Sequence, residues 1–181
     1  FGGNPDMVAR LIPDMNGALY FGHAGNTGDA ILWGQQLDAD LANLGAYQGH
    51  GSVATGHGIL ISWALMMEGG IQVNGQGRRF SNEHDGYSEQ ARRVMGQPGG
   101  VAFDIYDERL HELGLDFEDY RRADQAGAVR RADDLAGLAA LCDLPEAALA
   151  DTVETCAALS RGDSEDEFGR DFTTKPALAP P

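Results

Sequence analysis

Glycine is the residue that most limits what this chain can form. The 181 residues include 25 glycines, about twice the share of an average protein. Glycine is typical of tight turns and of close backbone approaches, and it weakens helices and strands from within. We therefore expect short helices and strands joined by many turns. The hydrophobic fraction of 43% still allows one domain of ordinary size to bury a real core.

The N-terminal part predicts two helices separated by a glycine-rich loop. The first begins with Asn4 as N-cap and Pro5 in its first turn, and ends near Pro13. The second is an amphipathic helix that follows the loop "AGNTGD" and ends at Gly45. Residues 48–58 are rich in glycine and histidine, which favours a loop.

The middle of the chain predicts strands. "ILISWALMM" is an apolar run of nine residues, and "GIQVN" followed by the turn "NGQG" and "RRF" indicates a hairpin. "VAFDIYDE" alternates as a strand does, and between them a helix is stopped by Gly96 and Pro98. A turn or two of helix at 109–114 follows. Three helices complete the pattern, with N-caps expected at Asp116, at Ala132 or Asp133, and at Leu144–Pro145. This order predicts an α+β fold with a small mixed sheet and a helical C-terminal half.

Charge and cysteine content exclude several classes of function. A net charge of −15 disfavours nucleic acid, which requires clustered cations, and acidic membrane surfaces. The chain has no apolar run long enough to insert in a membrane. Cys142 and Cys156 lack metal-ligand spacing and are expected to be free thiols, which favours a cytoplasmic protein. The acidic, Arg-rich and Lys-poor composition indicates a bacterium with a GC-rich genome.

Several motifs, taken in order, resemble one flavoprotein family: fumarate reductase, succinate dehydrogenase and 3-ketosteroid dehydrogenase. Any one motif would be weak, whereas several in order over about 170 residues are specific. Here Ala30 replaces the family's last glycine in one motif, and Gly51 replaces its proline in another. The matching stretches are "GGNPDMVARLIP", "GNTGDAILWGQQLDA", "QGH", "GGIQVNGQGRRFSNE", "ADDLAGLAALCDLPEAALADTV", "DEFGR" and "LAPP".

The resemblance implies a division of the chain and a cofactor. Residues 1–46 would be an edge of the FAD-binding domain, residues 47–170 the cap or substrate-binding domain, and residues 171–181 a connection back. The dinucleotide fingerprint Gly-x-Gly-x-x-Gly is not in this sequence. The first residue is not methionine and no signal-peptide pattern follows it, so we expect a processed chain or a domain of a longer oxidoreductase. Its partners would be the rest of the FAD-binding domain and a small-molecule substrate, and FAD would not stay bound to this chain alone.

The resemblance also nominates residues for chemistry. Fumarate reductases carry a proton-transferring arginine shortly after the Arg-Phe-x-Asn-Glu signature; here Tyr87 stands four residues after Glu83, and no arginine occurs before Arg92. Tyrosine at this spacing is similar to that of the 3-ketosteroid 1-dehydrogenases, in which it takes a proton from the substrate. The alternative is that Tyr87 is an aromatic anchor of a loop. His50 aligns with a histidine that binds a substrate carboxylate, and its alternative is a loop histidine without a special task.

Other positions follow from the same comparison. Trp63 and Met66 stand where fumarate reductases carry a proton-relaying Glu and Arg, which favours an apolar substrate. Asn26, Gly28 and Asp29 are expected beside the flavin at a helix start, with Asp29 also fitting a plain N-cap.

A further group is expected to be structural rather than to bind substrate. Polar side chains of the signature would fix the hairpin, and His57 would have no special task. His84 and Asp85 would lie in a solvated loop, with the alternative that they point into the cleft, and the acidic run from Asp163 would be a solvated turn. The group comprises Arg78, Arg79, Asn82, Glu83, His57, His84, Asp85 and the run at 163–167.

Three functions therefore remain open. The first is a 3-ketosteroid dehydrogenase-like oxidoreductase acting on a carbon–carbon bond next to a carbonyl. The others are a fumarate reductase-like dicarboxylate reductase and a module that binds substrate or a partner without catalysis.

Overall fold

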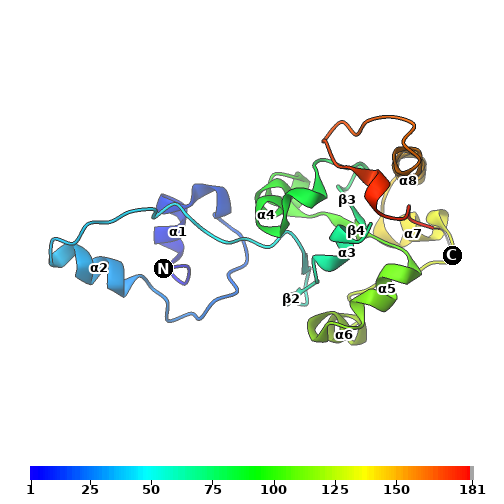
Figure 1. Cartoon of the computed structure of the whole chain (residues 1–181). Coiled ribbons are helices and arrows are strands. Elements are labelled where there is room, and N and C mark those ends of the chain that lie inside the picture. Colours follow the sequence, from blue (N-terminus) through cyan, green and yellow to red (C-terminus); the bar gives the residue numbers. More distant parts are fainter. Residues whose placement is uncertain (180–181) are drawn as a thin grey trace. The chain divides into compact units, whose positions relative to one another are not determined.

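The computed structural model describes residues 1–179, and the chain divides into two units, Phe1–Gln48 and the part that begins at Gly49. In Figure 1 the first unit runs from dark blue to cyan and carries two α-helices, and the second unit carries the strands and the remaining helices. No helix within residues 1–179 has the length and apolar character needed to cross a bilayer.

Sixteen short elements make up the described chain, as the glycine content predicts. The first unit contains α1 (Pro5–Leu11), the 3₁₀ turn η1 (Pro13–Met15) and α2 (Asp29–Gln36). The second unit contains, in order, β1 (Val53–Ala54), β2 (Ile59–Leu60), α3 (Ala64–Met67), β3 (Ile71–Val73), η2 (Glu83–Asp85), α4 (Tyr87–Met95), η3 (Pro98–Gly100), β4 (Phe103–Ile105), α5 (Glu108–Gly114), α6 (Glu118–Gln125), α7 (Leu135–Cys142), α8 (Glu146–Ser160) and η4 (Phe172–Thr174).

The first helix begins and ends as predicted. The side chain of Asn4 accepts a hydrogen bond from the N–H of Met7 (3.1 Å), and Pro5 occupies the first turn, where its missing N–H has no consequence. The helix stops before Pro13, which opens η1.

The second helix is shorter than predicted, since it ends at Gln36 and not at Gly45. Asp38 adopts the left-handed conformation (φ 57°), and the next N–H, that of Ala39, donates back to Gly34 O at 2.9 Å. This is the usual way in which a helix terminates. Asn43 is also left-handed (φ 56°), so helix cannot resume before Gly45.

The α+β class is confirmed, but the mixed sheet was a wrong prediction. The described strands form two separate antiparallel pairs, β1–β2 and β3–β4. β1 and β2 are joined by only four residues, too few for the crossover that a parallel pair needs. The first strand and the turn of this hairpin lie within the segment 48–58 that was expected to be a loop, and the apolar run 59–67 divides into β2 and α3.

The predicted hairpin after β3 is present in short form. Asn74 N–H donates to Arg78 O at 2.9 Å, and Val73 pairs with Arg79 in an isolated bridge. The main partner of β3 is nevertheless β4, with Gln72 opposite Asp104 and apolar residues on either side.

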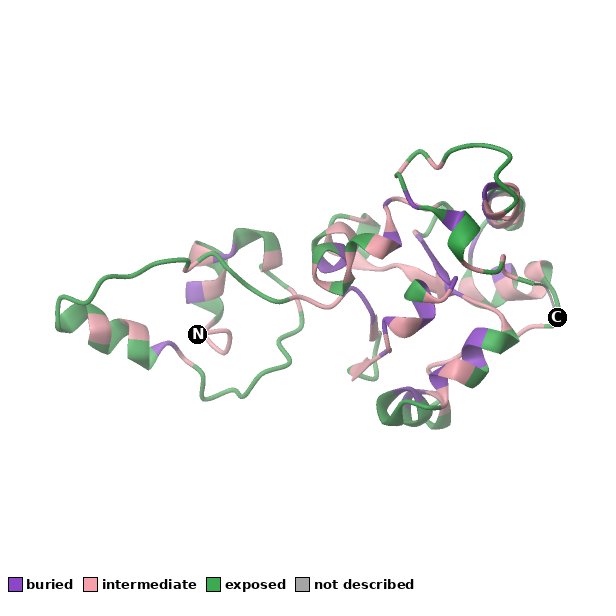
Figure 2. Ribbon diagram, viewed as in Figure 1, coloured by how far each residue is buried: buried purple, intermediate pink, exposed green. Residues whose placement is uncertain are grey.

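Two apolar clusters form the core of unit 2. One joins β3 and β4 to α7, α8 and η4 through residues such as Ile71, Leu149 and Phe172. The other joins α3, α5 and α6 through Leu65, Leu110 and others. Figure 2 shows buried residues along β3 and on α3 and α5, with exposed residues on the outer helices.

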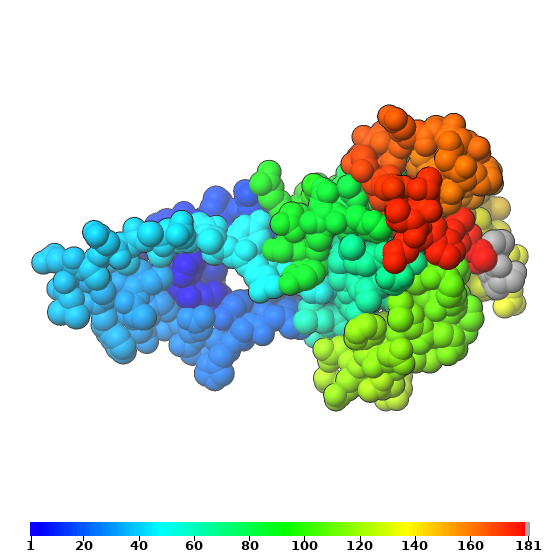
Figure 3. Space-filling view, viewed as in Figure 1, coloured from blue at the N-terminus to red at the C-terminus, as the bar shows by residue number. Residues whose placement is uncertain are grey.

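The helices of the C-terminal half form where they were expected, with small shifts at their starts. The N-caps are Phe117 for α6 and Asp134 for α7, each one residue or more beyond the predicted position, and Pro145 for α8. Asp134 caps through its side chain, which accepts from Gly137 N–H at 2.7 Å. After α8 the chain returns across unit 2; in Figure 3 this segment, orange to red, lies beside the β3 region.

Candidate functional site

The segment 49–52 is fastened to the start of α4 by backbone contacts. Gly51 N–H donates to Tyr87 O at 2.8 Å, and Gly49 N–H donates to Ser88 Oγ at 3.0 Å. A Cβ on Gly51 would lie 2.8 Å from the Cβ of Gln90, so only glycine allows this approach. The glycine that replaces the family's proline is therefore what brings the segment against α4.

This contact brings together residues that are distant in the sequence. The rings of His50 and Tyr87 stack, with centroids 5.2 Å apart and an interplanar angle of 24°. The ring of Trp63 meets His50 edge-on, with centroids 6.2 Å apart. Trp63 is buried, His50 is partly buried and Tyr87 is 38% exposed. The three rings, which we call the aromatic cluster, thus have one open side.

His50 is held in one orientation by its own segment. Its Nδ1 accepts a hydrogen bond from Ser52 N–H at 3.1 Å. With Nδ1 used in this way, the neutral ring carries its proton on Nε2. Burial lowers the pKa of His50. The ring is therefore a neutral hydrogen-bond donor through Nε2 at physiological pH.

A buried network of charged residues contacts Trp63 of the aromatic cluster. Trp63 Nε1 donates to Glu83 O at 3.2 Å, and the Glu83 side chain is fully buried. Arg79 binds the Glu83 carboxylate through Nε (2.9 Å) and a terminal nitrogen (2.8 Å), and Arg170 binds it at 3.1 Å. Burial opposes ionisation of Glu83, but these cations outweigh it and lower its pKa. The structural role predicted for Arg79 and Glu83 agrees with these contacts.

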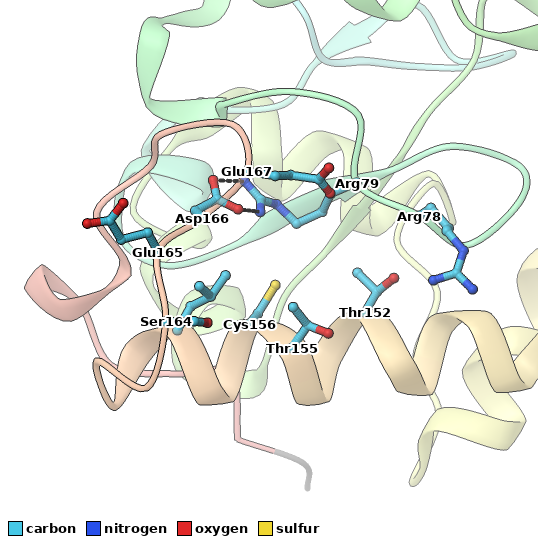
Figure 4. Close-up of a pocket in the computed structure, with 10 residues that line it drawn as sticks. Arg78, Arg79, Thr152, Thr155, Cys156, Ser164, Glu165, Asp166 and Glu167 are labelled. Carbon is cyan, nitrogen blue, oxygen red and sulfur yellow. Dashed lines mark hydrogen bonds and ion pairs between the residues drawn. The ribbon is translucent and has the colours of Figure 1, made fainter.

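The acidic run 163–167 was wrongly predicted to be wholly solvated. The Asp166 side chain is only 2% exposed and pairs with Arg79 at 2.6 Å. Figure 4 shows Arg79 directed toward Asp166, whereas Arg78 points away from it. Arg78 is 58% exposed and has only a 3.8 Å contact with Asp151. A charge run in sequence does not show which one of its carboxylates faces inward.

The remaining nominated residues lie outside the aromatic cluster. Met66 is buried in the core, and its carbonyl accepts from His84 Nε2 at 3.2 Å. The ring nitrogens of His57 lie 3.1 Å from the carbonyl oxygens of Thr55 and Ala126. Their contacts give these three a structural role.

Two polar residues of the signature also serve the local fold. Asn82 caps η2 through a bond from His84 N–H at 2.9 Å. Asp85 pairs with Arg93 at 2.5 Å, with both side chains partly exposed.

The predicted flavin-side residues lie together in the first unit. Gly28 is the N-cap of α2 with φ 93°, so Asp29 is the first helical residue and not the N-cap. Asp29 accepts from Thr27 Oγ1 at 3.0 Å, and Asn26 accepts from the N-terminal amine at 3.0 Å. A Cβ on Gly28 would lie 2.5 Å from the sulfur of Met7. Gly28 is therefore required by both the turn and the packing.

Two other groupings were considered as sites. The pocket in Figure 4 lies between Arg79 and α8, but two of its hydroxyls and the Arg79 guanidinium already have protein partners: Thr152 donates to Gly77 O, Thr155 to Asp151 O and Arg79 to Asp166. Glu108, His111 and Glu112 lie within reach of one cation. Both ring nitrogens of His111 are engaged, however, by Tyr120 Oη and by the Arg131 guanidinium.

One set of buried polar residues was not foreseen from the sequence. Hydrogen bonds connect the segment 49–52, the β3–β4 sheet and α4 through the side chains of Ser52, Asp104, Gln72 and Gln90. The signal was present, because Gln72 and Asp104 each interrupt an otherwise apolar strand. It is recognisable only once the register places them opposite each other.

Comparisons with known proteins agree with the predicted resemblance. The family described as "FAD binding domain" matches residues 1–178. A probable fumarate reductase, Ifc3, of Shewanella frigidimarina (strain NCIMB 400) is 26% identical over 170 residues, which are 94% of this chain and 28% of that protein. The chain spans less than a third of the length of the curated relatives it matches.

Two solved structures are similar over nearly the whole chain. The open conformation of a flavocytochrome c3 fumarate reductase superposes with a TM-score of 0.78 at 26% identity, covering 99% of this chain and 32% of that one. The 3-ketosteroid-Δ4-(5α)-dehydrogenase from Rhodococcus jostii RHA1, in complex with 4-androstene-3,17-dione, gives 0.65 at 26% identity, covering 99% and 36%. The chain belongs to the FAD binding domain family, whose relatives include fumarate reductases and 3-ketosteroid dehydrogenases.

Proposed function

We propose that this chain is the substrate-covering part of an FAD-dependent oxidoreductase that acts on a carbon–carbon bond next to a carbonyl, as 3-ketosteroid dehydrogenases do. In this proposal residues 1–46 form an edge of the FAD-binding domain, residues 47–170 the cap, and residues 171–181 a connection back. The observation that carries it is the stacking of His50 on Tyr87 with Trp63 at the edge.

The first unit fits a role beside FAD. Gly28 in the left-handed conformation opens α2, and no side chain caps that helix within the described residues. A helix start of this kind presents N–H groups to an anionic ligand such as a pyrophosphate. Asn26, Gly28 and Asp29 would hold the cofactor, which supplies the acceptor or donor of a hydride when it is bound.

The exposed apolar side chains of the first unit support the proposal that another part of the protein covers them. Only Met7 and Ile12 of its apolar side chains are buried, whereas Trp33 is 62% exposed and Leu37 is 81% exposed. A unit of this size cannot bury enough surface to be stable by itself. We propose that the rest of the FAD-binding domain covers these side chains.

The aromatic cluster suggests how the chain's own residues would handle a ketone. His50 Nε2–H would donate to the substrate carbonyl oxygen, which acidifies the neighbouring C–H. The Tyr87 oxygen, as phenolate, would take that proton, while the hydride leaves the adjacent carbon. A free phenol has a pKa near 10, so the site must favour the phenolate for this step to proceed.

The composition of the cluster favours a neutral, apolar substrate. Tyr87, which is 38% exposed, offers aromatic surface, and the Arg93 guanidinium on α4 is already paired with Asp85. Binding of a dicarboxylate requires cationic side chains in the site that are not already neutralised by carboxylates, and this chain carries a net charge of −15. Its steroid-dehydrogenase relative was solved with an apolar ketone, 4-androstene-3,17-dione.

A second candidate is a fumarate reductase-like dicarboxylate reductase. The observation in its favour is that the relative named above for sequence similarity, Ifc3, is a probable fumarate reductase.

The experiment that tests the proposal uses the natural protein that carries this chain, reconstituted with FAD. Anaerobic mixing with 4-androstene-3,17-dione should bleach the oxidised flavin in a single turnover. Tyr87→Phe should slow the bleaching by at least about 10²-fold, the usual contribution of a positioned acid or base. Phe117→Leu, which alters an exposed aromatic residue of the cap, is the control. Bleaching at an unchanged rate in Tyr87→Phe would refute the role of Tyr87.

A further inference from the structure

Two polar residues face each other in the centre of the β3–β4 sheet. Gln72 and Asp104 are register partners between the apolar pairs Ile71–Ile105 and Val73–Phe103. Because side chains alternate along a strand, the apolar pairs face α7 and α8 while Gln72 and Asp104 face the opposite side. That side is covered by the segment 49–52 and by α4.

Asp104 and Gln72 of the sheet bind the segment 49–52 through hydrogen bonds. Ser52 Oγ donates to one oxygen of the Asp104 carboxylate, and Gln72 Nε2 donates to the other at 2.8 Å. Gln72 Nε2 also donates to Gly51 O at 3.0 Å. Hydrogen bonds from the sheet thereby fix Gly51 through its carbonyl and the next residue, Ser52, through its hydroxyl.

The same two residues contact the aromatic cluster with their N–H groups. Ser52 N–H donates to His50 Nδ1, and Gly51 N–H donates to Tyr87 O. α4, which carries Tyr87, is tied to the sheet separately, since Gln90 Nε2 donates to Gln72 Oε1 at 2.9 Å. The sheet is thus connected to both rings of the stacked pair by short chains of hydrogen bonds.

The carboxylate at the centre of this network is unusual. Asp104 is partly buried, and no ion pair to its carboxylate is found within residues 1–179. Burial raises its pKa, and the bonds from Ser52 and Gln72 only partly oppose this effect. A carboxylate that is shielded from water and has no cation beside it is less favourable for the fold than a neutral group of the same shape. Its presence therefore calls for a role other than stability.

We propose that Asp104 is a positioning residue for His50: through Ser52 and Gln72 it fixes the backbone from which Ser52 N–H binds Nδ1. This leaves the proton of the neutral imidazole on Nε2. Asp104 itself contacts neither the substrate nor the rings. The chemical use of His50 rests on the proposed function, but its positioning does not.

The test measures the Ser52–His50 bond directly in the natural protein that carries this chain. A ¹⁵N–¹⁵N coupling through the hydrogen bond, from Ser52 N to His50 Nδ1, is expected at a pH above 6.5, where the ring is neutral. Asp104→Ala should abolish the coupling and move the pKa of His50 upward toward its ordinary value, as the ring becomes more solvated. Asp104→Asn should retain the coupling, because its amide can donate to Ser52 Oγ and accept from Gln72.

Two further variants make the result decisive. Ser52→Ala removes only the hydroxyl and keeps the N–H, so it should weaken the coupling even if Asp104→Ala fails to fold. Asp116→Ala removes an exposed carboxylate of the same unit and should change nothing. An unchanged coupling in Ser52→Ala and in folded Asp104→Ala would overturn the proposal.

The outcomes separate this inference from the proposed function. If the coupling depends on Asp104 while a steroid does not bleach the flavin, the positioning role stands and the proposed substrate is wrong. If the steroid bleaches the flavin and the coupling does not depend on Asp104, the reverse holds.

Discussion

Replacing Arg79 with methionine would remove the cation that joins the hairpin after β3 to the segment after α8. Its guanidinium binds both oxygens of Glu83 and both of Asp166, and it lies 4.7 Å from the ring centroid of Phe172. Burial alone would lower the pKa of Arg79, but the bonds to Glu83 and Asp166 raise it above the ordinary value. The charge is therefore paired in a dry environment.

The size of the effect follows from what remains. Methionine keeps most of the side-chain volume, so the cavity contribution is small. Glu83 retains Arg170, but Asp166, with 2% of its side chain exposed, loses its cation. Removing one partner of a buried ion pair costs about 3–5 kcal/mol. For an m-value of about 2 kcal/mol per molar, this lowers the urea midpoint by roughly 2 M.

The neighbouring residue gives a matched control. Arg78→Met makes the same chemical change in a pair that is 58% and 69% exposed, with a contact of 3.8 Å, which is worth at most about 1 kcal/mol. Urea unfolding would be followed by the fluorescence of the buried Trp63, in a Trp33→Phe background that removes the tryptophan of the first unit. A midpoint for Arg79→Met within experimental error of that for Arg78→Met would refute the reasoning.

Two further predictions concern pH and the first unit. The pKa values of His50 and His84 are lowered by burial in the folded chain, so the unfolded chain binds protons more readily. The free energy of unfolding should therefore fall as pH decreases below about 6.5. Equilibrium unfolding above and below that pH should show a weaker dependence of this free energy on pH in a His50→Gln, His84→Gln double variant. Gly28→Ala should disrupt the start of α2, because it places a Cβ at φ 93° and 2.5 Å from Met7 Sδ at a cost of at least about 1–2 kcal/mol; hydrogen exchange at 26–32 that is no faster than in wild type would contradict this.

The sequence correctly predicted where several helices begin or end, because helix caps depend on residues that are close in the sequence. Asn4 and Pro5 start α1, Gly96 ends α4 and Pro145 precedes α8, as the sequence indicates. The prediction failed at α2, because the period of its apolar residues continues beyond Gln36 while Asp38 turns left-handed. Asp tolerates that conformation, but nothing in the local pattern shows that it adopts it.

Long-range contacts were predictable only in part. The resemblance to a family nominated His50, Trp63 and Tyr87 separately, and the structure shows that their rings meet. The ion pair of Asp166 with Arg79 joins residues 87 positions apart, and no periodicity encodes such a partner. The pairing of Gln72 with Asp104 likewise depends on strand register, which short strands specify weakly in sequence.

The central claim is that the aromatic cluster acts on an apolar ketone and not on a dicarboxylate. The most direct measurement compares the two in the natural FAD-loaded protein that carries this chain, under anaerobic conditions. The account predicts that 4-androstene-3,17-dione bleaches the oxidised flavin and that fumarate leaves the reduced flavin unchanged. Rapid reoxidation of the reduced flavin by fumarate, with no response to the steroid, would contradict it.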